Sequence, residues 1–97
     1  MSYSIQFHPD LKGDLKALPK HVRTAVLNEH FPRLQNNPSI GKPLTGVLAG
    51  LYSYAITFPG TQYRIAYRII ESDLVVFVFM VGKREGFYDR LKQRFTP

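Results

Sequence analysis

The sequence predicts an α+β fold, in which an N-terminal strand and a helical hairpin pack on a small antiparallel sheet and a short helix ends the chain. Residues 3–7 alternate apolar and polar side chains, which is typical of a half-buried strand. Residues 11–34 repeat apolar side chains at helical spacing, and residues 51–81 contain apolar segments separated by turn-forming residues. Because the predicted helices and strands are grouped rather than alternating, the pattern favours the α+β class.

Two helices are predicted to follow the first strand. Residues 8–10 contain a proline and an aspartate, and both residue types are favoured in the first turn of a helix. Pro19 ends this helix and can start a second one. Pro32 is expected to kink the second helix or end it one turn early, because its ring clashes with the preceding turn. The apolar faces of the two helices are formed by Leu11, Leu15, Leu18, Val22, Val26, Leu27, Phe31 and Leu34.

Three strands are predicted in the second half of the chain. Residues 39–50 are rich in glycine and are expected to form a loop before them. Residues 51–57 and 62–70 alternate in character and are separated by a proline–glycine turn. Residues 74–81 are apolar at every position, which predicts a central strand covered on both faces. Because the connections are short, the three strands should form an antiparallel meander.

A short helix is predicted at the end of the chain, because Phe87, Leu91 and Phe95 recur at helical spacing. The other side of this helix carries Arg90, Lys92 and Arg94. With 97 residues, the chain is predicted to form one domain that spans residues 1–97.

The amino-acid composition excludes some classes of protein and favours a partner with negative charge. The chain has no cysteine, so neither a disulfide nor a thiolate metal site is available. The N-terminus lacks the features of a signal peptide, and no apolar run approaches the ~18 residues of a membrane-spanning helix. We therefore expect a cytoplasmic protein that makes no membrane contact. The net charge of +6 favours a polyanionic partner, either nucleic acid or an acidic protein, over an ordinary basic surface.

Three kinds of catalytic site are not expected. His8, His21 and His30 lack the spacing of metal ligands and are expected to be surface or capping residues. The sequence contains neither a serine-hydrolase elbow nor a phosphate-binding P-loop. Its acidic residues are scattered, which argues against a two-metal nuclease. We therefore expect no metal and no small-molecule cofactor.

A group of basic residues and one tyrosine could instead form a site. Arg64 and Arg68 lie on one face of a predicted strand, and Lys83 and Arg84 follow the end of the next strand. Tyr88 lies at the start of the last helix. In a meander these five residues, here called the cationic cluster, can converge on one edge. Arginine side chains match phosphate oxygens, and a tyrosine can stack on a base or exchange a proton.

A purely structural interpretation also fits the strand arginines. In it, Arg64 and Arg68 flank the surface of the sheet and pair with Glu71 or Asp73. Residue spacing alone supports the two interpretations equally.

Four segments carry a resemblance to a known family. They are DLKALPKHVR in the helical hairpin, GKPLTGVLAGLY in the loop, YRIAYRI in the strand, and VVFVFMVGKREGFY at the C-terminal end. In this order they resemble the RelE/ParE superfamily of toxins from bacterial toxin–antitoxin pairs, over almost the whole chain. The resemblance implies a RelE-like fold, with N-terminal helices on an antiparallel sheet, which is similar to the fold predicted above.

The resemblance implies a metal-independent endoribonuclease that cuts messenger RNA in the A site of a translating ribosome. The ribose 2′-OH attacks the scissile phosphate, a step that needs a base, an acid and positive charge. Arg64 matches the arginine of the family's Tyr-Arg strand, and Arg84 matches that of its Gly-His/Lys-Arg motif. Lys83 occupies the His/Lys position of that motif, and Tyr88 matches the C-terminal tyrosine. The resemblance thus makes Arg64, Lys83, Arg84 and Tyr88 the expected catalytic residues.

One departure from the family keeps alternatives open. Ribonuclease members usually carry a basic residue near the position of Ala55, and the segment LYSYAITF has none; Lys42 in the preceding loop is the candidate to compensate for it. The other branch of the family consists of ParE-like toxins that inhibit DNA gyrase without a nuclease site. A member that only binds its antitoxin is a third interpretation.

The partners implied by the resemblance are a cognate antitoxin protein and a ribosome with its messenger and ribosomal RNA. We expect the antitoxin to cover or distort the cationic cluster with a helix or strand. Contacts with RNA should weaken steeply with salt. The residues expected to bind RNA or the ribosome are Lys12, Lys16, Lys20, Arg23, Lys42 and Arg68.

Overall fold

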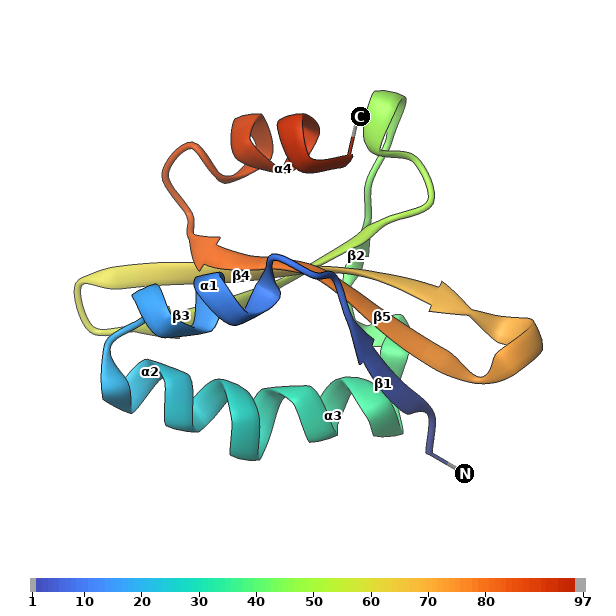
Figure 1. Cartoon of the computed structure of the whole chain (residues 1–97), viewed down its shortest axis with the longest axis horizontal. Helices are drawn as coiled ribbons and strands as arrows, with labels where there is room; N and C mark the ends of the chain where they lie inside the picture. Colours follow the sequence, from blue (N-terminus) through green and yellow to red (C-terminus); the bar gives the residue numbers. More distant parts are fainter. Residues whose placement is uncertain (1, 96–97) are drawn as a thin grey trace.

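The computed structural model describes residues 2–95 and confirms the predicted α+β fold (Figure 1). The described residues form one five-stranded sheet in the order β1-β5-β4-β3-β2. The strands are β1 (Ser4–Phe7), β2 (Lys42–Pro43), β3 (Tyr52–Phe58), β4 (Thr61–Ile70) and β5 (Val75–Lys83). The helices are α1 (Leu11–Ala17), α2 (Lys20–Ala25), the π-helical turn η1 (Val26–His30), α3 (Phe31–Asn36) and α4 (Phe87–Phe95). Short 3-10 turns occupy η2 (Pro38–Ile40), η3 (Gly46–Leu48) and η4 (Glu71–Asp73).

The sheet matches the prediction in its meander and differs at its ends. β3, β4 and β5 pair antiparallel as expected, and β5 lies inside the sheet between β1 and β4. β1, however, pairs parallel to β5, so the sheet is mixed rather than purely antiparallel. The predicted loop at residues 39–50 contains the short strand β2. Leu74 is not part of β5, because its backbone adopts a left-handed conformation with φ of 53° after the turn η4.

The second helix continues through Pro32, so the expected early end is wrong. α2, η1 and α3 follow one another without a break. The π-helical turn places the hydrogen bond of the Phe31 N–H on the carbonyl of Val26, which widens the helix just before the proline. Pro32 then lies in the first turn of α3, where its missing N–H is tolerated.

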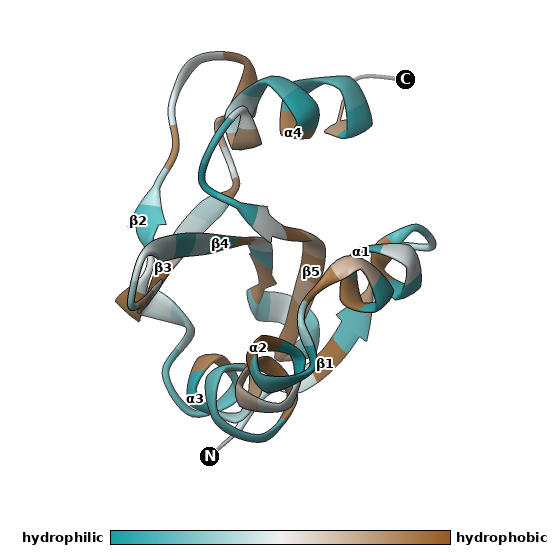
Figure 2. Cartoon of the chain, turned by 90° about the vertical axis from the view of Figure 1, so that its left-hand side faces the viewer, coloured by the Kyte–Doolittle hydropathy of each residue, from teal (hydrophilic) through white to brown (hydrophobic). Residues whose placement is uncertain are grey.

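Two hydrophobic clusters cover the two faces of the sheet. Helices α1 to α3 pack on one face, against Tyr63, Ile65 and Tyr67 of β4. Helix α4 packs on the other face, where Phe87 and Leu91 contact a cluster that includes Ala66 and Met80. Figure 2 shows α4 apart from α2 and α3, with the strands between them. The alternation along β4 therefore sends Arg64 to the α4 face, since it lies between residues of the helical face.

Tyr67 fixes the segment that follows α3. Its side chain is fully buried, and its hydroxyl donates to the carbonyl of Pro38 at 2.6 Å and accepts from the Gly41 N–H at 2.9 Å. Burial raises the pKa of Tyr67 to about 12, so the hydroxyl keeps its proton at neutral pH. A Cβ at Gly41 would overlap this hydroxyl, so only glycine fits there. The contact holds β2 and Lys42 beside β3.

Beyond the end of β1, side chains form hydrogen bonds with the backbone of β5 in place of a strand partner. The Asp14 carboxylate accepts the Val81 N–H at 3.1 Å, and Arg94 donates from Nη1 to the Phe79 carbonyl at 2.9 Å. Arg94 also donates to both Asp14 oxygens, at 2.6 and 2.9 Å. The pair therefore satisfies backbone groups that a longer β1 would otherwise bind, and it fastens α4 to α1 and β5.

Replacing Gly13 with alanine is expected to stabilise the fold. Gly13 lies inside α1 and is exposed, and a Cβ there would meet no other atom within 4 Å. Alanine should raise the free energy of unfolding by about 0.5–1 kcal/mol, because it restricts the unfolded chain and favours the helix. Thermal unfolding would then shift upward by about 2–6 °C.

Gly50→Ala is the matched control for this substitution. Its Cβ would also meet nothing within 4 Å, but its φ of +98° disfavours any L side chain. Gly50→Ala should therefore lower the unfolding temperature. Equal effects of the two substitutions would contradict this account.

Candidate functional site

Arg64 and Tyr88 form the centre of the candidate site on the α4 face of the sheet. Arg64 of β4 lies between Ala55 of β3 and Gly82 of β5 in the strand register. Its guanidinium carbon lies 5.5 Å from the centroid of the Tyr88 ring, which is the geometry of a cation–π contact. Ala55 is exposed, so the Ala55 side of the stacked pair is open, whereas Arg90 and Phe87 lie next to Gly82 on the other side.

Helix α4 and one hydrogen bond fix the tyrosine. Phe87 and Leu91 are buried, so they hold the first turn of α4 against the sheet. The Tyr88 hydroxyl donates to Oγ of Ser53 at 3.2 Å, and Ser53 is itself buried. Tyr88 is thus oriented before any ligand arrives. Ser53 was not predicted, although its alternation with Ala55 along β3 already places both on one face.

The arginine has binding capacity that the protein does not use. Nε of Arg64 is buried, and no described residue accepts a hydrogen bond from it. Within residues 2–95, neither Arg64 nor Arg68 forms an ion pair with an acidic residue of the η4 turn. Glu71 of that turn instead accepts a hydrogen bond from the Tyr3 hydroxyl at 2.9 Å. The purely structural pairing is therefore not observed. A buried donor without an acceptor is costly, and an anion at this position would relieve that cost.

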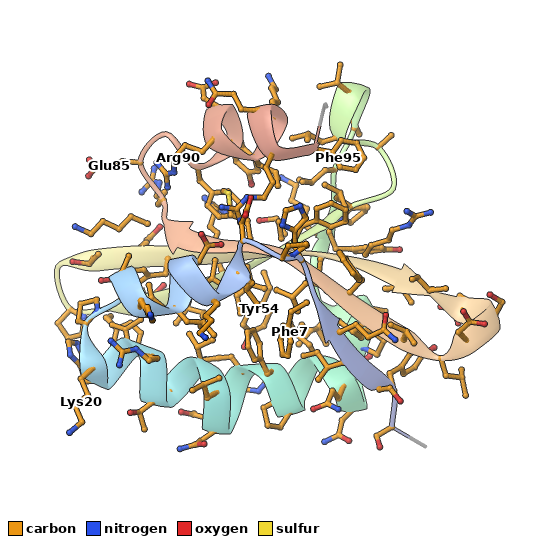
Figure 3. The ribbon with its side chains drawn as sticks, viewed as in Figure 1. Phe7, Lys20, Tyr54, Glu85, Arg90 and Phe95 are labelled. Atoms are coloured by element: carbon orange, nitrogen blue, oxygen red, sulfur yellow. The ribbon has the colours of Figure 1, made fainter. Side chains whose placement is uncertain are left out.

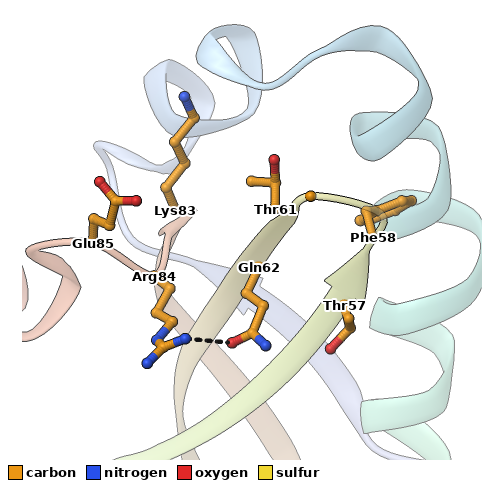
Figure 4. A pocket seen from close by; sticks show the side chains of 8 residues that line it. Thr57, Phe58, Thr61, Gln62, Lys83, Arg84 and Glu85 are labelled. Carbon is orange, nitrogen blue, oxygen red and sulfur yellow. Dashed lines mark hydrogen bonds between the residues drawn. The ribbon is translucent and has the colours of Figure 1, made fainter.

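Arg84 belongs to the same side of the sheet. Its backbone N–H donates to the Gln62 carbonyl at 2.9 Å, which continues the strand pairing past the end of β5. Its Nη1 lies 3.4 Å from Oε1 of Gln62 (Figure 4). Gln62 was not predicted, but it alternates with Arg64 along β4, so the pattern places both on the α4 face.

Lys83 is the member of the predicted catalytic set that the structure separates from the others. It pairs with Tyr63, whose side chain is buried on the helical face, and Figure 4 shows Lys83 and Arg84 pointing in opposite directions. Both residues line a hollow of ≈ 730 Å³ at the end of the β3–β4 hairpin. Arg64, Arg84 and Tyr88 thus share one side, and Lys83 lies across the edge from them.

The expected RNA-binding residues are spread over both faces. Lys12, Lys16 and Lys20 are exposed on α1 and at the start of α2, on the helical side (Figure 3 labels Lys20). Arg23 instead caps α1, because it donates to the Leu15 carbonyl at 2.9 Å and also to the carbonyl of Leu18 at 3.0 Å. That structural contact was not predicted from the sequence.

Lys42 and Arg68 lie on the α4 face, at different distances from the centre. Lys42 is exposed and pairs with Ser53, so it lies next to the row that contains Ala55 and Arg64. Arg68 is exposed and pairs with Phe77, about 13 Å along β4 from Arg64 at the usual rise per residue. Because Ser53 also accepts from the Tyr88 hydroxyl, Lys42 lies beside the residue that holds the tyrosine.

The histidines have structural contacts, and they form no metal site. His8 Nδ1 accepts from the Asp10 N–H at 3.0 Å, directly before the first turn of α1. His30 Nδ1 lies 2.9 Å from the Tyr54 hydroxyl, and burial lowers the pKa of His30. No group of three or more potential metal-ligating side chains occurs in the described part of the chain. No helix among the described residues is long and apolar enough to cross a membrane.

Comparisons with known proteins give a consistent family assignment. The family model described as "ParE-like toxin of type II bacterial toxin-antitoxin system" matches residues 5–92. The toxin RelG of Mycobacterium tuberculosis is 35% identical over 91 residues, which cover 93% of this chain and 100% of RelG. Among solved structures, the RelBE2 toxin–antitoxin complex of the same species matches with a TM-score of 0.73 and 34% identity, over 87% of this chain and 100% of the matched chain. A mutant of the E. coli toxin RelE in the free state matches with a TM-score of 0.75 and 27% identity, over 97% and 98% of the two chains.

Proposed function

The chain belongs to the ParE-like toxins of type II bacterial toxin–antitoxin systems, and we propose that this member is a ribosome-dependent endoribonuclease that cuts messenger RNA and inhibits translation. The observation that carries the proposal is the stacked pair of Arg64 and Tyr88, with Arg84 on the same side. Among the described residues, neither arginine has an ion-pair partner. This arrangement suits a phosphate next to a base.

The proposed reaction is an in-line displacement at phosphorus. The ribose 2′-oxygen forms a bond to the scissile phosphorus, and the bond from phosphorus to the 5′-oxygen breaks. The 2′-OH gives its proton to a base, and the departing 5′-oxygen takes a proton from an acid. Arg64 and Arg84 stabilise the extra negative charge on the phosphate oxygens in the transition state. Tyr88 stacks on the adjacent base or shares in proton transfer, with Ser53 holding its hydroxyl.

Lys83 has a different place in the proposed reaction from Arg64, Arg84 and Tyr88. Its side chain points away from Arg84 across the end of β5 (Figure 4). To share in proton transfer, the Lys83 side chain has to rotate to the side of the sheet on which Arg84 lies. In its present conformation it instead contacts RNA that passes along the edge of the sheet.

A cognate antitoxin and the ribosome are the proposed partners. The related RelBE2 and E. coli RelBE structures are toxin–antitoxin complexes, which supports an antitoxin for this chain. The exposed lysines Lys12, Lys16 and Lys20 supply positive charge on the helical side for ribosomal RNA.

Inhibition of DNA gyrase is the second candidate function, and Ala55 favours it. Ala55 lies beside Arg64 in the register and is exposed, so the position that usually supplies a further cation is uncharged. Induced expression followed by primer extension on a translated transcript separates the two functions. Cuts at codon-related positions within minutes would support the ribonuclease. Intact messages with continuing translation and failing supercoiling would instead identify gyrase as the target.

Ala55→Lys is expected to increase cleavage. The new ammonium group would lie next to Arg64 on the open side of the stacked pair. One additional surface cation near the phosphate is worth on the order of 1 kcal/mol, so the cleavage rate should rise about fivefold. Thr24→Lys adds the same charge at an exposed position of α2 on the helical side, where it acts on ribosome binding, and it should leave the cleavage rate at saturating toxin unchanged. Equal rates for the two variants would show that no cation is missing at Ala55.

A further inference from the structure

Arg90 makes a specific pair of contacts with the backbone beside Arg84. It projects from α4 toward the loop between β5 and α4 (Figure 3). Its Nη1 donates to the Glu85 carbonyl at 2.7 Å, and its Nη2 donates to the Lys83 carbonyl at 3.0 Å. These carbonyls belong to the residues immediately before and after Arg84. One guanidinium therefore holds the backbone on both sides of a proposed phosphate-binding residue.

The glycines around this loop make room for the guanidinium. A Cβ at Gly82 would lie 3.2 Å from Nη2 of Arg90, and a Cβ at Gly86 would lie 3.1 Å from Nη1. Gly86 also has a φ of +65°, which disfavours other residues. The Arg90 N–H donates to the Gly86 carbonyl at 3.1 Å, so the helix begins directly at this contact. Larger residues at either glycine would displace the Arg90 side chain.

Arg84 depends on its backbone for its position. Its side chain forms one hydrogen bond to another described residue, the 3.4 Å approach to Gln62, which is long for such a bond. Its N–H is held at 2.9 Å by Gln62 on the strand side. Arg90 supplies the opposing constraint through the flanking carbonyls. Displacement of a reacting group by about 1 Å can cost about 100-fold in rate, so this constraint bears on catalysis.

We propose that Arg90 is a positioning residue for message cleavage, which holds residues 83–86 so that Arg84 meets the scissile phosphate. The inference rests on the proposed ribonuclease function. Arg90 acts through the planar arrangement of its two nitrogens rather than through its charge. Lysine carries the same charge but lacks the planar fork, and so it cannot hold both carbonyls in this geometry.

The test measures single-turnover cleavage of a message on ribosomes stalled with a vacant A site, by primer extension over time. Arg90→Ala and Arg90→Lys should both lower the rate at saturating toxin about tenfold or more. The toxin concentration that gives half of the maximal rate should change less than twofold. Gln93→Ala, also exposed on α4, is the matched control and should cleave as the wild type does. Amide hydrogen exchange should become faster at residues 84–86 in both Arg90 variants.

A double-mutant cycle between Gly82 and Arg90 compares cleavage rates in a way that a general loss of stability does not reproduce. Gly82→Ala should slow cleavage in the wild-type background, because its Cβ pushes on the Arg90 guanidinium. In the Arg90→Ala background the same change should cost less than twofold, because the crowded group is gone. Additive losses would overturn the inference.

The remaining outcomes separate this inference from the proposed function. If the wild type cleaves and Arg90→Lys retains its full rate, Arg90 acts by charge and the positioning role is wrong. If the wild type cleaves and loop exchange is unchanged in Arg90→Ala, the positioning role is also wrong. If the wild-type toxin cuts no message under conditions in which it arrests growth, the proposed function fails and the positioning role of Arg90 in cleavage fails with it.

Discussion

Replacing Arg64 with alanine is expected to lower the rate of message cleavage by about 100-fold or more, because a preorganised cation next to the developing charge is lost. Arg64 has a buried Nε without an acceptor among the described residues, and its guanidinium stacks on Tyr88. The substitution therefore removes the proposed phosphate contact and the cation that lies over the ring of Tyr88. Growth arrest on induction should disappear in parallel with cleavage.

Two companion variants separate the role of Arg64 from general charge and folding. Arg64→Lys keeps the charge but loses the planar fork, so its rate should fall between those of the alanine variant and the wild type. Arg33→Gln removes one positive charge from the exposed surface of α3 and should cleave normally. Near-ultraviolet circular dichroism and antitoxin binding report on the fold. A folded Arg64→Ala protein that still arrests growth would remove Arg64 from the mechanism.

Replacing Asp14 with alanine is expected to lower the free energy of unfolding by about 3 kcal/mol. The Asp14 side chain is 13% exposed and that of Arg94 is 18% exposed, so the loss leaves a largely buried guanidinium without its carboxylate. It also leaves the Val81 N–H at the edge of β5 without an acceptor. Thermal unfolding should move down by about 12–24 °C, and α4 should become the first element to lose amide protection.

Asp10→Ala is the matched control for this change. Asp10 also lies near Arg94, at 4.0 Å, but its side chain is 67% exposed and solvent weakens the pair. Its replacement should alter the free energy of unfolding by less than about 0.5 kcal/mol. Comparable losses at Asp10 and Asp14 would show that the fastening of α4 does not depend on the buried pair.

The sequence predicted those parts of the fold that local patterns determine. Alternation located β3 and β4, and helical spacing located α1 and α4. The parallel direction of β1 could not be predicted, because a strand has the same period of two in either direction. Leu74 continues an apolar run but has a left-handed backbone, and the run of residue types contains no sign of that turn. The sequence showed the conflict at Pro32, but not that a π-helical turn before the proline would resolve it without ending the helix.

The candidate site was predictable only in those parts that local sequence patterns determine. Arg64 and Tyr88 come together because strand alternation and helix packing both direct them to the α4 face. Lys83 and Arg84 are neighbours in sequence, and they point apart because adjacent residues of a strand face opposite sides, which the pattern could have indicated. The roles of Arg23 and Arg90 depend on carbonyl groups brought near them by the folded backbone. A basic side chain in a sequence does not reveal such acceptors.

The pairing of the first strand with the last has a consequence for synthesis of the protein. β1 needs β5 as its partner, and Asp14 needs Arg94, which lies 80 residues further along the chain. Contacts of such long sequence separation form late and slow the folding of a domain. A chain still growing from the N-terminus therefore cannot bring Tyr88 over Arg64 until α4 has left the ribosome. Under the proposed function, the toxin is inactive until α4 has emerged and packed on the sheet.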